Sequence, residues 1–184
     1  MFTKRLAIIV FAILTLTACK DNKKETDNAA QVAPVIENFS VEFNIIAKKG
    51  DDFAVYYTED NTNNFVGEKA VWGGIKGGGV EEKVTINLPS SINPTNIRLD
   101  FGIKPDREDV IVKSLKFVFF DQSFEIKGSD FLTYFVENPE FKTSTDVATG
   151  TTTIIRTPNF EKTGTYFYPK LALLEKIKGI TKGK

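Results

Sequence analysis

The chain has 184 residues with 24 basic and 24 acidic side chains, so its formal net charge is zero and no basic excess indicates a nucleic-acid partner. It contains no histidine and a single cysteine, which excludes Ser-His-Asp and Cys-His catalysis and an internal disulfide. Its glycines match neither a Walker A loop nor a dinucleotide-binding fingerprint, and we expect no metal and no cofactor.

The N-terminus has the pattern of an export signal. Lys4 and Arg5 form a short positive region, and an almost unbroken apolar run follows over residues 6–16. As a helix this run would be about 16 Å long, which is well short of a bilayer core of about 30 Å. The pattern predicts a signal peptide over residues 1–18 and not a permanent membrane span.

The residues after the apolar run have the pattern of a lipidation site. The sequence Leu16-Thr17-Ala18-Cys19 resembles the lipobox of bacterial lipoproteins. The resemblance implies cleavage before Cys19, transfer of a diacylglycerol group to its thiol and attachment of palmitate, and several acyl chains on one residue hold a protein stably in a membrane. The alternative is a plain secretory signal with an incidental cysteine. We therefore expect a lipid-anchored envelope protein of the outer membrane, on its periplasmic or surface-exposed face.

Residues 19–35 predict a tether. They are polar and charged, with too few large apolar groups to form a core. A flexible chain of this length spans roughly 20–24 Å. The charges at Lys20, Asp21, Glu25 and Asp27 resemble the segment that sends lipoproteins of Bacteroidetes-type bacteria to the cell surface, although a spacer without sorting content is the alternative.

Residues 36–184 carry the alternating apolar pattern of β-strands. Strands are expected at residues 39–48, 53–58, 69–75, 84–88, 97–101, 110–120, 123–127, 151–156 and 165–174, with turns at 49–52 and 76–79. One short helix is expected at residues 130–136 with Ser129 as its N-cap, and residues 171–177 also fit a helical period. Many short strands with regular turns predict an all-β fold, a single antiparallel, jelly-roll-like β-sandwich.

Three stretches resemble a β-sandwich module that is common in Bacteroidetes surface proteins. They are residues 53–60, residues 82–89, and residues 97–102 leading into 110–115. In order they give a strand ending at an acidic loop, a strand running into proline, and an Arg-x-Asp strand. The layout is similar to galactose-binding-like and carbohydrate-binding modules and covers about half of the mature chain. The resemblance implies a sandwich fold and carbohydrate binding.

Five side chains are candidates for a ligand site. A sugar presents apolar faces ringed by hydroxyls, so a flat ring with neighbouring polar groups suits it. Trp72, beside two glycines, is the first candidate, with a core tryptophan as the alternative. Tyr56 and Tyr57 point to opposite faces of one strand, so at most one belongs to the core. Arg98 and Asp100 share a strand face and form either a polar pair toward a ligand or an ordinary ion pair.

Acidic residues group in predicted turns at Asp51-Asp52, Glu59-Asp60, Glu81-Glu82 and residues 106–109. Two carboxylates in a cleft could hydrolyse a glycosidic bond, but acids are also common in turns because turns are hydrated. Residues 60–64 carry side-chain oxygens at alternate positions, which is a pattern that can bind Ca²⁺. The segment is not an EF-hand loop, however, because Phe65 occupies the position of the required glycine.

Three functions are compatible with these features. The first is a non-catalytic surface lipoprotein that binds carbohydrate or a glycoconjugate. The second is a structural or interaction subunit that docks on another envelope protein, for which the 16 phenylalanines would supply apolar surface. The third is a carboxylate-dependent glycoside hydrolase. We expect the partners to be a membrane through the N-terminal lipid and either a polysaccharide or an envelope protein.

Overall fold

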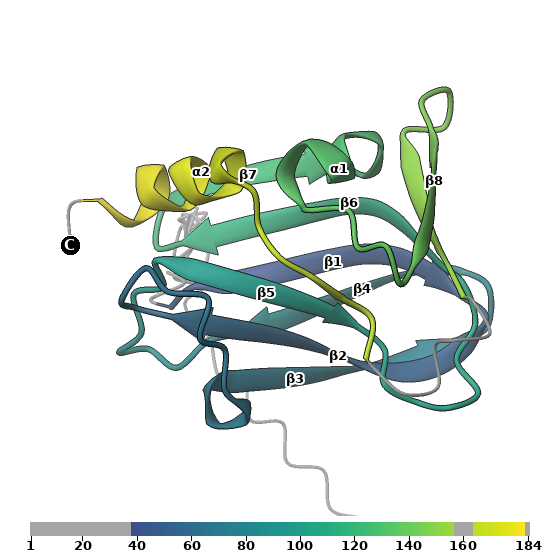
Figure 1. The fold of residues 1–184 in the computed structure, drawn as a ribbon, viewed down its shortest axis with the longest axis horizontal. Helices are drawn as coiled ribbons and strands as arrows, with labels where there is room; N and C mark the ends of the chain where they lie inside the picture. The colour runs from purple at the N-terminus through teal and green to yellow at the C-terminus, as the bar shows by residue number, and fades with distance from the viewer. Residues whose placement is uncertain (1–37, 157–163, 183–184) are drawn as a thin grey trace, which may run out of the picture. The chain divides into compact units, whose positions relative to one another are not determined.

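The computed structural model describes residues 38–156 and 164–182, which belong to one compact unit, Pro34–Lys184 (Figure 1). The predicted signal peptide over residues 1–18, Cys19 and the predicted tether over residues 19–35 lie outside the described residues. Their assignment therefore stays a prediction from the sequence.

Two antiparallel sheets form the described structure. The first sheet has the order β4-β1-β6-β9-β8, with β7 also paired to β6, and the second has the order β10-β5-β2-β3. Strands of the first sheet are β1 (Ser40–Ala47), β4 (Glu81–Asn87), β6 (Val110–Phe119), β7 (Gln122–Lys127), β8 (Lys142–Asp146) and β9 (Thr151–Ile155). Strands of the second are β2 (Lys49–Thr58), β3 (Ala70–Gly77), β5 (Asn96–Phe101) and β10 (Tyr166–Phe167). The predicted all-β sandwich is confirmed.

Short helices accompany the sheets. They are α1 (Phe131–Tyr134), α2 (Leu171–Thr181) and the 3-10 turns η1 (Gly67–Lys69) and η2 (Gly128–Asp130). In Figure 1, α1 and α2 lie on the same side of the sandwich, close to β7. Their apolar side chains complete the core there, because Phe131 of α1, Phe135 directly after it, and Leu173 and Ile177 of α2 are fully buried.

Four local predictions differ from the structure. The expected turn over residues 49–52 is the first part of β2, which pairs with β3, and the chain changes sheets at Lys48. Ser129 lies in η2 and does not cap α1. Of the last predicted strand, residues 165–174, only Tyr166 and Phe167 form a strand. Its last residues, from Leu171 onward, belong to α2, which agrees with the helical period noted for residues 171–177. The strand β8 was not predicted, because its sequence Lys-Thr-Ser-Thr-Asp is polar throughout and gives no alternation.

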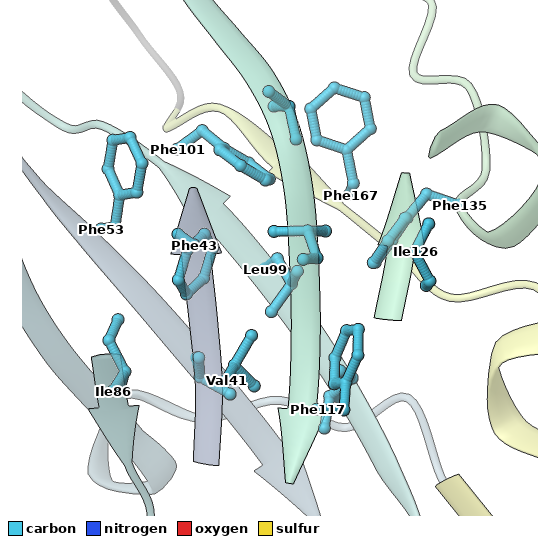
Figure 2. Close-up of a cluster of buried hydrophobic side chains, with 14 of the residues drawn as sticks. Val41, Phe43, Phe53, Ile86, Leu99, Phe101, Phe117, Ile126, Phe135 and Phe167 are labelled. Carbon is cyan, nitrogen blue, oxygen red and sulfur yellow. The ribbon is translucent and has the colours of Figure 1, made fainter. Parts of the chain in front are cut away.

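The core is rich in phenylalanine rings that join the two sheets (Figure 2). Phe43 of β1 meets Phe53 of β2 and Phe101 of β5 with ring centroids 5.4–5.6 Å apart in edge-on geometry. Phe101 continues to Phe131 and Phe167 at 5.8 and 5.9 Å. Since these pairs stabilise beyond the burial of their area, one aromatic cluster connects both sheets, α1 and β10.

A buried carboxylate fixes the turn that leaves β5. Asp51 is 4% exposed, and its Oδ1 accepts hydrogen bonds from the backbone N–H groups of Ile103 and Lys104 at 2.9 and 3.1 Å. Gly102 between β5 and this turn has φ of +100°, and a Cβ there would lie 2.4 Å from Asp51 Oδ2. The glycine therefore permits both the left-handed backbone and the close approach of the carboxylate.

This arrangement predicts that alanine variants of two neighbouring aspartates lose very different amounts of unfolding free energy. We expect Asp51→Ala to lower the free energy of unfolding by about 1–3 kcal/mol, because it leaves buried N–H groups without an acceptor. Asp52→Ala is the matched control, because its half-exposed carboxylate only lies 3.9 Å from Lys104, a contact of about 0–1 kcal/mol. Urea unfolding followed by circular dichroism measures both, and equal losses would contradict the proposed role of Asp51.

Candidate functional site

The outer face of the second sheet carries a cluster of aromatic rings around one arginine. We call this cluster the aromatic platform; it consists of Arg98 and the rings of Tyr56, Phe65, Trp72, Tyr166 and Tyr168. Side chains alternate between the two faces of a strand. Because the neighbours Val55, Leu99 and Phe167 point into the core, the platform residues of β2, β5 and β10 point outward.

Strand register places these side chains in adjacent rows. Ala54 of β2 pairs with Trp72 of β3 on one side and with Asp100 of β5 on the other, and Asp100 pairs with Tyr166 of β10. Tyr56 pairs with Arg98 in the next row. The platform therefore runs across all strands of the second sheet, perpendicular to their direction.

Arg98 lies at the centre of the platform and is held from several sides. Its Nε and Nη2 each donate to a carboxylate oxygen of Asp100 at 2.8 Å, and its guanidinium carbon lies 3.8 Å from the ring centroid of Tyr56. The rings of Tyr166 and Phe65 lie 5.1 and 5.9 Å from the same carbon. A two-pronged ion pair against aromatic faces is a rigid arrangement for arginine.

The ionisation of this pair follows from its burial. Burial raises the pKa of the Asp100 carboxyl above its ordinary value, and the adjacent Arg98 partly offsets that rise. Burial also lowers the pKa of Arg98, but hydrogen bonds with Asp100 and Tyr168 outweigh it, so the pKa of Arg98 is raised overall. Arg98 therefore stays charged, and its charge is balanced within the platform.

Trp72 is the most exposed ring of the platform. It is 45% exposed and meets Tyr56 edge-on with centroids 6.2 Å apart. The alternative of a core tryptophan is therefore wrong. Gly74 follows on the same face of β3 and carries no side chain there. The indole thus offers a flat apolar surface to solvent.

The five sequence candidates separate into two groups. Trp72, Tyr56, Arg98 and Asp100 come together on the outer face through strand pairing, whereas alternation alone had predicted only that Arg98 and Asp100 share a face. Tyr57 is 7% exposed and belongs to the core on the opposite face of β2, so it is not available to a ligand at the platform. The reason is the strand period of two, which allows only one of the adjacent tyrosines to face outward.

Three platform residues were not among the candidates. Tyr166 and Tyr168 flank the buried Phe167, and this Tyr-Phe-Tyr alternation is a signal in the sequence that could have found them. Phe65 lies in the loop after β2, where no periodicity points to it. The loop is positioned by the buried Asn96, whose Nδ2 donates to the carbonyl of Thr62 at 3.0 Å.

A hollow of about 190 Å³ adjoins the platform at β10. It is lined by the two platform tyrosines and the segment after α1, namely Val136, Glu137, Asn138, Pro139, Tyr166 and Tyr168. Hydrogen bonds hold that segment against β10, since Val136 N–H donates to the Tyr168 carbonyl at 2.9 Å and Asn138 Nδ2 donates to the Tyr166 carbonyl at 3.3 Å. The hollow combines ring surface, a carboxylate and tyrosine hydroxyls.

A larger hollow of about 260 Å³ lies elsewhere, between α2 and the loops near β5. Its lining includes Asn96, Leu171, Leu174, Glu175 and Lys178 but no aromatic ring. It therefore lacks the flat surface on which a sugar stacks, and the platform is the better candidate site.

The acidic turns that were considered for hydrolysis have structural partners. Glu82 accepts from the backbone N–H groups of Lys76 and Gly77 in the turn between β3 and β4. Asp60 accepts from Thr62 within its own loop, and these hydrogen bonds lower the pKa of Asp60. Across residues 38–156 and 164–182, no group of three or more histidine, cysteine, aspartate or glutamate side chains could hold a metal ion.

Within those same ranges, no helix has the length and apolar character needed to cross a membrane. Comparison of the chain with protein-family models, with curated proteins and with solved structures gives no match. The described residues form an antiparallel β-sandwich with an aromatic platform on the outer face of its second sheet.

Proposed function

We propose that this protein is a membrane-anchored surface lipoprotein that binds carbohydrate or a glycoconjugate on the aromatic platform without catalysing a reaction. The observation that carries the proposal is the exposed indole of Trp72 beside Tyr56 on a rigid sheet. Sugar rings present C–H groups on one face, and a flat aromatic ring contacts that face with a small loss of conformational entropy, because the indole already packs against Tyr56.

The polar groups of the platform complement such a ligand. Hydroxyls of Tyr56, Tyr166 and Tyr168 donate and accept hydrogen bonds, and the hollow beside β10 adds the carboxylate of Glu137. A concave or flat site with ring surface and a few polar groups is the usual arrangement for small polar ligands. The engagement of the acidic turns within the fold supports binding over hydrolysis.

The test is a panel of polysaccharides with the chain from Lys20 onward, which lacks Cys19. We expect retardation in affinity gels that contain a bound polysaccharide, and we expect Trp72 fluorescence to change on binding. The absence of binding across a broad panel of plant, algal and bacterial polysaccharides would refute the proposal.

A second candidate function is docking on another envelope protein. Two exposed apolar side chains favour it. Val66 is 39% exposed and follows the platform residue Phe65 along the chain, and Val136 is 44% exposed and lines the hollow. Cross-linking in intact cells distinguishes the two functions, because a docking subunit would yield one dominant protein partner that a Trp72→Ala chain loses.

The anchor is tested separately. In cells that make the protein, we expect Cys19→Ser to abolish labelling with a palmitate analogue and to move the chain from the membrane to the soluble fraction, because the acyl chains supply the membrane affinity. Asn22→Ser is the matched control and should leave labelling unchanged. A membrane-bound Cys19→Ser chain of mature size would contradict lipidation at this residue.

A further inference from the structure

The charge balance of the platform restricts the ligands that it can bind. Arg98 is the cation at its centre, but Nε and Nη2 already donate to Asp100, and one face of the guanidinium lies on the Tyr56 ring. Only 16% of the Arg98 side chain is exposed. Because the buried Asp100 already balances its charge, Arg98 offers little net attraction to a carboxylate or sulfate on a ligand.

The hollow beside β10 adds negative charge. Glu137 is exposed, and it is the one charged side chain among the described residues that line the hollow. Two residues before Ala54 on the same face of β2, Asp52 lies 3.9 Å from Lys104. A ligand crossing the platform therefore meets the Arg98–Asp100 pair, whose charges balance, and the Glu137 carboxylate of the hollow, which repels an anionic ligand and not an uncharged one.

The platform is longer than a single sugar ring. Trp72 lies on β3 and Tyr166 on β10, which are three strand steps apart in the sheet order. Neighbouring strands are about 4.8 Å apart, so this distance is about 14 Å. The hollow extends the surface beyond Tyr166. A single sugar ring would cover only part of it.

We propose that the ligand is an uncharged oligosaccharide that runs across the strands from Trp72 to the hollow beside β10, and that acidic glycans are rejected. This inference rests on the proposed function, since it names the class of carbohydrate for the same site.

The experiment compares two sets of probes at equal ionic strength, using the chain from Lys20 onward. The uncharged probes are β-glucan, galactomannan and xylan, and the acidic probes are alginate, polygalacturonate and chondroitin sulfate. We expect at least one uncharged probe to bind about tenfold more tightly than every acidic one, and fragments of the bound probe to gain affinity as they lengthen beyond a single sugar.

The possible failures are distinguishable. Preferential binding of an acidic probe, or a single sugar that binds as tightly as the longer fragments, would overturn this inference and leave the proposed function standing. Failure of every probe would refute the proposed function, and this inference with it.

A charge-neutralising variant tests the mechanism of rejection. Glu137→Gln should strengthen binding of alginate about two- to fivefold, and this gain should disappear in high salt. The readout is the ratio of alginate affinity to uncharged-probe affinity, because Glu137 also lines the hollow that an uncharged ligand would enter. Glu175→Gln, on the exposed face of α2 and away from the platform, is the matched control and should have no effect. An alginate affinity that Glu137→Gln leaves unchanged or lowers would overturn the inference.

Discussion

Replacing Phe101 by alanine is expected to lower the free energy of unfolding by about 3–5 kcal/mol. The ring is 1% exposed and contacts four other phenylalanines from both sheets, α1 and β10. Those partners belong to separate strands and a helix, so they cannot collapse together into the vacated space, and the cavity term adds to the lost transfer energy. A domain stability is typically about 5–15 kcal/mol, so the variant should be close to unfolding.

Urea unfolding monitored by Trp72 fluorescence and by circular dichroism measures this effect. The midpoint should fall by roughly 1–5 M, since the slope is about 1–3 kcal/mol per molar urea. Phe124→Ala is the control, because Phe124 is half-buried and stacks on Phe117 alone among the described rings, with centroids 4.8 Å apart. If Phe101→Ala cost no more than Phe124→Ala, the central position of Phe101 in the core would be contradicted.

Replacing Trp72 by alanine is expected to weaken binding of the preferred polysaccharide roughly thirtyfold, which corresponds to about 2 kcal/mol for a central aromatic anchor. The indole is exposed, so its removal leaves no cavity. The unfolding free energy should change by less than about 1 kcal/mol, the value of its edge-on contact with Tyr56. Loss of binding with an intact fold is the signature of a ligand surface.

The control for this variant is Val147→Ala, at a side chain that is 82% exposed next to the turn between β8 and β9 of the other sheet. It should alter neither binding nor stability. Circular dichroism is the suitable probe of folding, because Trp72 is the only tryptophan. Unchanged binding in Trp72→Ala would remove the indole from the site and with it the main support for carbohydrate recognition.

Much of the candidate site could be predicted from local pattern. Alternation put Arg98 and Asp100 on one face of their strand and separated Tyr56 from Tyr57, and the structure has both arrangements. Local pattern could not include Phe65, because its position depends on a loop that Asn96, far along the chain, holds in place. It also could not detect β8, whose polar sequence becomes a strand only because β9 supplies its hydrogen-bond partners.

The sequence by itself determined most of the strands and which side chains share a strand face, because a period of two is a property of the extended backbone. It also carries the prediction of export and lipidation at Cys19. Only the tertiary structure decided which strands are neighbours, and therefore that Trp72, Tyr56, Arg98 and Tyr166 share one surface. That choice depends on pairing between distant segments such as β5 and β10, whose register comes from packing of the whole core and not from any single strand.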